Sequence, residues 1–162
     1  MQYKITPNLW FDTQAEEAAS FYVSVFKNSH IATVNRYPEG APGPAGTVMT
    51  VEFELDGQRF VGINGGPQFT FDEAVSFQIN CEDQAEVDYF WERLTEGGEE
   101  SQCGWLKDKY GLSWQVVPQG MDEVFADSDP ERAQRAMQAM LGMRKLDLAA
   151  LQAAADGVPT PS

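Results

Sequence analysis

The chain has 162 residues, 43% of them hydrophobic, and a formal net charge of −14 that results from 25 acidic and 11 basic side chains. A chain of this length forms one compact domain or two small halves that share a core. Because the sequence contains no cluster of Lys and Arg, we expect no binding to nucleic acid, whose phosphates must be neutralised by cations.

The hydropathy pattern argues against a membrane protein. No run approaches about 18 uncharged apolar residues, so we expect no membrane span. The first residues, MQYKITPNLWF, lack the charged and apolar regions of a secretory signal, and we expect a cytoplasmic protein. The excess of acidic side chains is expected to form a solvated surface. The alternative is an acidic site that binds a cationic ligand.

Soft metal ligands are scarce. The chain has two cysteines, Cys81 and Cys103, and one histidine, His30. Without a secretory signal we expect free thiols and no disulfide. Three such residues are too few for any usual zinc site.

The first half of the chain reads as a strand, a helix and three further strands. Residues 5–11 alternate as a strand, and Thr13 with Glu16 predicts a capping box. The helix that follows shows an apolar face made of Ala18, Phe21, Tyr22, Val25 and Phe26. Strands are expected at 30–37, 47–55 and 59–64. A loop rich in Gly and Pro at 38–46 follows the first of them, and an Asp-Gly hairpin turn joins the last two.

The second half repeats this pattern. Residues 74–81 read as a strand, and Asp83 with Glu86 repeats the cap. Val87, Phe90, Trp91 and Leu94 repeat the helical spacing. Strands at 102–106 and 112–117 follow. The chain therefore predicts two modules, at 1–66 and 67–120, within a single structural domain.

Residues 121–162 read as a helical extension. Asp129 followed by Pro130 is a typical helix start, and Asp147 is expected to cap a last short helix that contains Leu148 and Leu151. The first of these helices carries an apolar stripe made of Ala133, Ala136, Met137, Met140 and Leu141. Such a stripe is typical of a core or of a contact between subunits.

The strand alternation predicts two different sheet faces. One face is apolar and must pack on the helices: it carries Leu9, Phe11, Phe77, Ile79, Cys81, Leu112, Trp114 and Val116. The other carries Thr6, Asn8, Trp10, Ser76, Gln78, Asn80, Ser113 and Gln115. Uncharged polar groups with a Trp favour the lining of a cavity for a small polar or aromatic molecule. The alternative is an open, solvated sheet face.

Several long stretches resemble one protein family. They are ITPNLWFDTQAEEAASFYVSVF at 5–26, INGGPQFTF at 63–71, SFQINCEDQAEVDYFWERLTEGG at 76–98, QCGWLKDKYGLSWQVVP at 102–118 and RAMQAMLGMRKLDLAALQAA at 135–154. The chain resembles the PhnB-like branch of the vicinal oxygen chelate superfamily, also called the glyoxalase/bleomycin-resistance/dihydroxybiphenyl dioxygenase fold. This branch is often labelled a 3-demethylubiquinone-9 3-methyltransferase domain.

The resemblance implies an α+β fold with two tandem βαβββ modules, and a homodimer. Metal-using members place His or Glu at four inward strand positions, two in each module. Here those positions correspond to Thr6, to Gly62 or Asn64, to Ser76 and to Gln115. Neutral oxygen donors are poor ligands for a divalent transition metal, so we expect neither a metal nor another cofactor. The expected ligand-binding residues are Thr6, Asn8, Trp10, Asn64, Ser76, Gln78, Ser113 and Gln115.

Two functions remain open at this stage. The first is a binding protein of the bleomycin-resistance kind that holds a small molecule. The second is an enzyme, either methyltransferase-like or a metal-free lyase or isomerase. A sulfonium cofactor usually needs a Gly-rich loop after the first strand, and none follows residue 11. Titratable candidates are Glu52, Glu54, Lys109 and Tyr110, and Cys103 is a candidate nucleophile, but no triad is visible.

Overall fold

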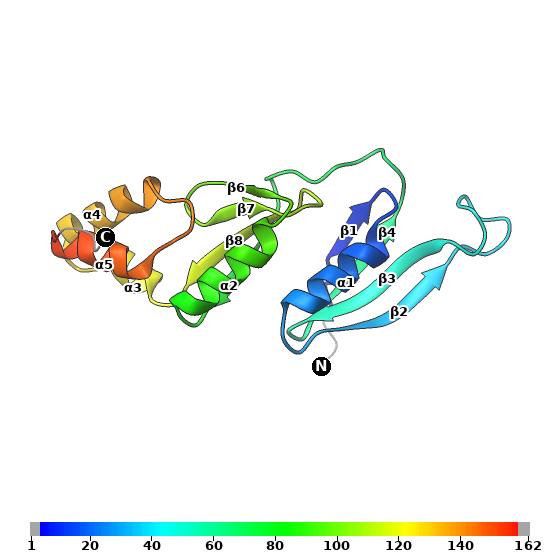
Figure 1. The fold of residues 1–162 in the computed structure, drawn as a ribbon, viewed down its shortest axis with the longest axis horizontal. Helices are drawn as coiled ribbons and strands as arrows, with labels where there is room; N and C mark the ends of the chain where they lie inside the picture. The colour runs from blue at the N-terminus through cyan, green and yellow to red at the C-terminus, as the bar shows by residue number, and fades with distance from the viewer. Residues whose placement is uncertain (1–3, 159–162) are drawn as a thin grey trace. The chain divides into compact units, whose positions relative to one another are not determined.

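The computed structural model describes residues 4–158, which form two compact units with a boundary between Phe71 and Asp72. The first unit contains β1 (Asn8–Phe11), α1 (Ala15–Val25), β2 (His30–Arg36), β3 (Val48–Leu55) and β4 (Gln58–Asn64). Its sheet has the order β1-β4-β3-β2, with β1 parallel to β4 and the other neighbours antiparallel. Figure 1 shows α1 against one face of this sheet.

The second unit repeats this topology. It contains β5 (Ser76–Cys81), α2 (Gln84–Thr95), β6 (Glu99–Glu100), β7 (Trp105–Lys107) and β8 (Ser113–Pro118), with strand order β5-β8-β7-β6. Three helices follow: α3 (Met121–Phe125), α4 (Pro130–Leu141) and α5 (Leu148–Asp156). The predicted α+β fold with duplicated βαβββ modules is confirmed. No helix within residues 4–158 combines the length and apolar content needed to cross a bilayer.

The helix side of each sheet forms the core, as the alternation predicts. In the first unit the buried strand side chains are Leu9, Phe11, Val51, Phe53, Leu55 and Phe60; in the second they are Ile79, Cys81, Leu106, Trp114 and Val116. Phe77 is only half-buried. The helix stripes cover these faces, because removing apolar surface from water is the main favourable contribution to folding.

The start of α1 differs from the predicted capping box. The helix begins after Gln14, which makes no side-chain cap, and Thr13 is exposed. The amide of Ala15 instead donates to Oδ1 of Asn64, at 2.8 Å, and Nδ2 of Asn64 donates to the carbonyl of Val48, at 3.1 Å. A side chain from β4 therefore supplies the cap that local sequence assigns to Thr13. The second predicted cap is confirmed, since Asp83 accepts from the amide of Glu86 at 2.9 Å.

Several strands begin later than their patterns suggest. The first starts at Asn8 instead of residue 5, and the strand expected at 102–106 is replaced by β7, which starts at Trp105. Cys103 and Gly104 have positive φ, of 59° and 84°, and their amides donate to the carbonyls of Met143 and Arg144. Both amides therefore bond to the segment after α4 instead of to a neighbouring strand, although the carbonyl of Gly104 still accepts from the amide of Val116 in β8, at 2.8 Å. The short strand β6 had no separate sequence signal.

An ion pair between Lys145 and Asp88, at 2.8 Å, and the side chain of Gln84 attach the helical extension to α2. Nε2 of Gln84 donates to the carbonyl of Leu146, and Oε1 of Gln84 accepts from the amide of Leu148. The predicted cap Asp147 accepts from the amide of Ala150, at 3.0 Å. On α4 the predicted stripe is divided, because Ala136 is buried whereas the side chains of Met137 and Leu141 are exposed. The extension is therefore part of the second unit.

Candidate functional site

A row of polar side chains crosses the open face of the second sheet. Neighbouring strands pair Glu99 with Lys107, Lys107 with Ser113, and Ser113 with Ser76. Paired residues in a sheet point to the same face, so these four side chains form one line across β6, β7, β8 and β5. The predicted residues Ser76 and Ser113 are thus brought together with two charged residues.

A second row lies beside the first. Trp105 pairs with Gln115, and Gln115 pairs with Gln78. Nε2 of Gln115 donates to Oγ of Ser76, at 2.9 Å, which ties the two rows together. Gln78 is exposed and donates to Oδ1 of Asn80. The amide oxygen of Gln115 and the hydroxyl hydrogen of Ser76 remain available to a ligand by their chemistry.

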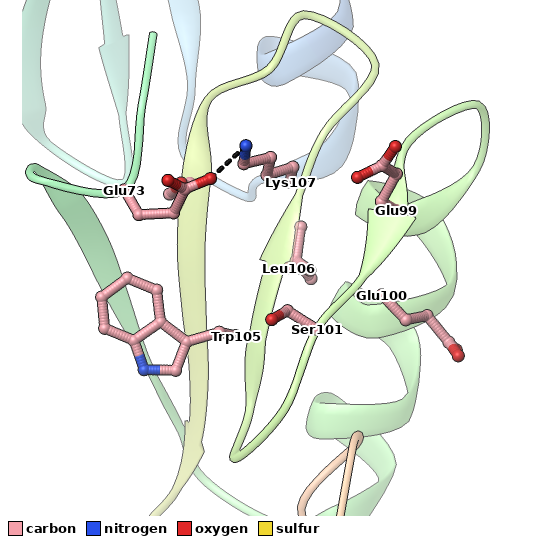
Figure 2. Close-up of a pocket in the computed structure, with 8 residues that line it drawn as sticks. Glu73, Glu99, Glu100, Ser101, Trp105, Leu106 and Lys107 are labelled. Carbon is pink, nitrogen blue, oxygen red and sulfur yellow. Dashed lines mark ion pairs between the residues drawn. The ribbon is translucent and has the colours of Figure 1, made fainter.

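Part of this face forms a hollow of about 160 Å³. It is lined by Glu73, Glu99, Glu100, Ser101, Trp105, Leu106, Lys107 and Ser113. Figure 2 shows the ammonium of Lys107 turned toward Glu73, with Glu99 on the other side of the lysine. Glu73 and Lys107 form an ion pair, and Glu73 lies in the segment before β5, outside the strands. The lining of the hollow therefore carries one cation and three carboxylates, and the cation lies between those of Glu73 and Glu99.

The close packing of β6 on β7 positions Glu99. A Cβ atom at Gly98 would lie 2.2 Å from the carbonyl oxygen of Lys107. Only glycine allows such a close approach of two backbones. The glycine at this position therefore brings Glu99 into the row beside Lys107.

The charges in the hollow influence one another. The hydrogen bond from Lys107 lowers the pKa of the Glu73 carboxyl, and the positive charge of the lysine adds to this effect. The same hydrogen bond raises the pKa of Lys107, with further contributions from the negative charges of Glu73, Glu99 and Asp72. Both side chains are therefore ionised at neutral pH.

Ser113 is the residue of this face that lacks a partner. Its side chain is fully buried, and within residues 4–158 its Oγ makes no hydrogen bond. A buried hydroxyl without a partner is unfavourable and unusual in folded proteins. It lies on the lining of the hollow, next to Lys107.

The open face of the first sheet is arranged differently. Asn8 is exposed, and its Nδ2 donates to the carbonyl of Thr6, at 3.0 Å. Nε1 of Trp10 donates to the carbonyl of Gly66, at 2.9 Å, and its ring meets the ring of Phe69 edge-to-face at 5.0 Å. Trp10 is thus engaged by the chain that follows β4, where a Cβ atom at Gly65 would lie 2.2 Å from the ring.

Asn64 does not lie on this open face. It pairs with Phe11, whose side chain is buried. The oxygen and the nitrogen of its side-chain amide both form hydrogen bonds within the first unit. Gly62 also faces the helix, since a Cβ atom there would lie 3.2 Å from Cβ of Ala15. Neither alternative that the sequence left open for the fourth strand position lies on the open face of the sheet.

The internal repeat makes Val61 the equivalent of Gln115. The amide of Gly65 donates to the carbonyl of Phe11 just as the amide of Gln119 donates to that of Cys81. Phe11 and Cys81 are therefore equivalent residues of the two units. Three residues before them, the strand pair Asn8–Val61 of the first unit occupies the same place as the strand pair Gln78–Gln115 of the second. The residue equivalent to Gln115 is therefore Val61, and the residue equivalent to Ser76 is Thr6.

These four positions do not fit a metal ion. Thr6 and Ser76 are hydroxyls, Gln115 is an amide and Val61 has no donor atom. Divalent transition metals prefer imidazole, thiolate or carboxylate ligands. In the part of the chain that the structure describes, no group of three His, Cys, Asp or Glu side chains could hold an ion.

The other titratable candidates are engaged or inert. Glu52 accepts from Arg59 on the first sheet. Burial raises the pKa of the Cys81 thiol to about 12, so this cysteine is not a nucleophile at neutral pH. Sγ of Cys103 contacts the carbonyl of Met140, at 3.6 Å. Lys109 lies 5.7 Å from the ring of Tyr110, at the turn between β7 and β8.

A second hollow, of about 760 Å³, lies on the first unit beside the start of α1. Its lining includes Asp12, Glu16, Glu17 and Tyr37, whose hydroxyl donates to the carbonyl of Asn64 at 2.7 Å. Acidic residues at the start of a helix are stabilised by the helix dipole. These carboxylates are therefore explained without a bound cation.

Sequence reasoning missed three residues of the second face, which are Trp105, Lys107 and Glu99. Trp105 and Lys107 belong to β7, which the strand expected at 102–106 covers only in part. Alternation within Trp-Leu-Lys was the available signal, because Leu106 is buried and its two neighbours face the other side. A strand of three residues is too short for this signal to stand out.

Comparison with known proteins decides the family. Residues 3–117 match the family described as 3-demethylubiquinone-9 3-methyltransferase. The chain belongs to this family. A search among curated proteins found no match.

Solved structures of known proteins share the fold of this family member. A Bacillus cereus PhnB protein, described as a candidate 3-demethylubiquinone-9 3-methyltransferase, is 39% identical with a TM-score of 0.66, over 72% of this chain and 99% of that one. A Pseudomonas aeruginosa protein is 20% identical with a TM-score of 0.60, over 72% and 98%. The fosfomycin resistance protein FosX of Listeria monocytogenes, complexed with Mn(II) and sulfate, is 16% identical with a TM-score of 0.53, over 76% and 97%. The last two likenesses show the fold alone.

Proposed function

We propose that this family member binds a small polar or aromatic metabolite on its open sheet faces, without the divalent ion used by metal-dependent relatives of the fold. The observation that carries this proposal is the set of residues at the four superfamily positions: Thr6, Val61, Ser76 and Gln115. One of them has no donor atom and none carries a negative charge. Such a set orients a ligand by hydrogen bonds and does not neutralise a cation.

The second sheet supports the binding part of the proposal. Ser76, Gln115 and Ser113 present two hydroxyls and an amide within one patch, and Trp105 adds an aromatic ring. Ligand sites typically combine apolar surface with a few convergent polar groups. On the first sheet, Asn8, Thr6 and the ring of Trp10 are the proposed contributors, and Gln78 is one on the second.

An enzyme is the second candidate function. The family description and that of the Bacillus cereus relative favour a methyltransferase-like reaction. A metal-free lyase or isomerase is the other form of this candidate, and it needs a general base on the open face. Glu99 and Glu52 are the carboxylates with the right placement for that role.

Three measurements on the purified chain separate these functions. Elemental analysis should find no stoichiometric Mn, Zn, Ni or Fe, and calorimetric titration with S-adenosylmethionine should give no binding heat. NMR screening with a panel of planar metabolites should shift the amide signals of Ser76 and Gln115. The Gln115→Ala variant should bind any hit about tenfold more weakly, the effect of losing one good hydrogen bond to a ligand.

The matched control is Gln119→Ala, which removes an exposed glutamine just beyond β8. It should leave affinity unchanged, and both variants should unfold at the same temperature as the wild type. A stoichiometric metal would refute the metal-free proposal. Micromolar affinity for S-adenosylmethionine would favour the methyltransferase-like reaction instead.

We propose further that the chain acts as a homodimer. On α4 the side chains of Met137 and Leu141 are 42% and 58% exposed, and exposed apolar side chains on one helix are typical of a contact surface. The expected mass from light scattering after gel filtration is twice that of the chain. If α4 forms the contact, the double variant Met137→Lys with Leu141→Lys should lower this mass to that of one chain. The control variant Glu92→Lys on α2 should leave the mass unchanged.

A further inference from the structure

We propose that the hollow around Lys107 and Ser113 holds a single carboxylate group of the ligand, whose planar body lies on Trp105. This refinement rests on the proposed small-molecule function and names the chemical class of the ligand. The residues proposed to contact the ligand, together with Glu73 and Glu99, belong to the second unit and line one hollow. Three observations support it, which are an internal carboxylate, a buried hydroxyl and the surrounding charges.

The internal carboxylate is that of Glu73. It reaches Lys107 from the segment before β5, and 60% of its side chain is exposed, against 35% for that of the lysine. Exposed ion pairs contribute little to stability, so a competing group can displace this one. Figure 2 shows the Glu73 carboxylate paired with Lys107. We infer that it occupies the place of a ligand carboxylate.

The buried hydroxyl is that of Ser113, next to Lys107 on the adjoining strand. It has no partner in the described chain, although it is fully buried. A carboxylate bound to Lys107 would have a second oxygen that accepts from this hydroxyl. A hydrogen bond with an ionised partner is stronger than one between neutral groups, so the bound ligand would satisfy the hydroxyl.

The charges around the hollow favour a ligand group that carries a single negative charge. Glu99 pairs with Lys107 across the sheet, and Asp72 also acts on the lysine. When a monocarboxylate replaces Glu73, the charge beside Lys107 does not change. A dianion such as a phosphate ester would add a charge next to Glu99, which is unfavourable in a partly enclosed site. The half-buried ring of Trp105 lies on the same face and offers a surface to a planar group.

The test uses three probes that differ in charge. Benzoate, benzamide and phenyl phosphate are titrated into the full chain, and the amide signals of Lys107 and Ser113 and the indole signal of Trp105 are followed by NMR. Benzoate should shift all three signals in a saturable way. Benzamide and phenyl phosphate should bind about tenfold more weakly, since one lacks the charge and the other carries an extra one.

Three variants then identify the contacts. Lys107→Met should weaken benzoate binding about tenfold or more. Glu73→Gln should strengthen it about two- to fivefold, the range expected from removing a weak competing ion pair. Ser113→Ala should weaken it about tenfold without lowering the unfolding temperature, because no hydrogen bond of the free protein is lost.

The matched controls are Lys27→Met, which removes an exposed cation from the first unit, and Asp72→Asn, which removes a charge near Lys107 without breaking the ion pair. Lys27→Met should leave benzoate affinity unchanged, and Asp72→Asn should alter it less than Glu73→Gln does. The inference is overturned if benzamide binds as tightly as benzoate, or if Lys107→Met has no effect. A third outcome would overturn the carboxylate inference and leave the proposed small-molecule function in place. In that outcome benzamide shifts the NMR signals of Ser76 and Gln115, and it still does so in the Lys107→Met variant.

Discussion

Replacement of Asp108 by asparagine should lower the free energy of unfolding by about 2–3 kcal/mol, one of the larger effects expected for a single residue of this chain. Asp108 is 3% exposed. Its Oδ1 accepts from the amides of Tyr110 and Leu112, at 2.9 and 3.1 Å, and its Oδ2 accepts from Nε1 of Trp114 at 2.9 Å. The carboxylate thus satisfies three donors in the turn between β7 and β8.

An asparagine at this position has only one accepting oxygen. Its amide nitrogen would face either the indole of Trp114 or the two backbone amides, so at least one buried donor would lose its partner. The consequence extends to the candidate site, because this turn positions Lys107 and Ser113 on neighbouring strands.

Urea denaturation followed by near-ultraviolet circular dichroism measures the effect. Asp12→Asn is the matched control, because Asp12 is exposed and such substitutions change stability by less than about 0.5 kcal/mol. Equal denaturation midpoints for the Asp108→Asn variant and the wild type would show that the three hydrogen bonds do not stabilise the turn.

Asn64→Ala should lower the free energy of unfolding by about 2 kcal/mol, whereas Thr13→Ala should change it by less than about 0.5 kcal/mol. Asn64 caps α1 through Ala15, which is fully buried, and also bonds to Val48. Its removal leaves a buried donor and a partly buried acceptor without partners. Thr13 is exposed and does not cap the helix.

Asn64→Asp distinguishes the two bonds of this side chain. A carboxylate still accepts from the amide of Ala15 but cannot donate to the carbonyl of Val48, so we expect an intermediate loss of stability. Thermal unfolding of the three variants, monitored by far-ultraviolet circular dichroism, gives the order. A larger effect of Thr13→Ala than of Asn64→Ala would restore the local capping box as the start of α1.

Most of the architecture was predictable because it depends on local periodicity. The helix stripe around Phe90 and the cap at Asp83 follow from spacing within a few residues. The alternation in Ser113–Pro118 separates an apolar face from a polar one, whatever the partner strands are. The resemblance to a duplicated fold then required only that the two halves show the same order of elements.

The candidate site was predictable only in part. Ser76, Gln78, Ser113 and Gln115 share one open face, as the alternation implies. Asn64 was expected there and lies on the helix side, where it caps α1. Its residue type indicated a polar role, but the sequence could not indicate which of several distant backbone groups it would bond.

The amino-acid order therefore settled the duplicated fold, the buried stripes and the polar nature of the open faces, since each follows from side-chain spacing within one element. Only the folded chain made Val61 the equivalent of Gln115, brought Glu73 to Lys107, and, among residues 4–158, left the hydroxyl of Ser113 without a partner. These features depend on strand register and on contacts between distant segments. Hydrogen bonds and charges act over a few ångströms in space, and a linear pattern does not show which groups meet at that distance.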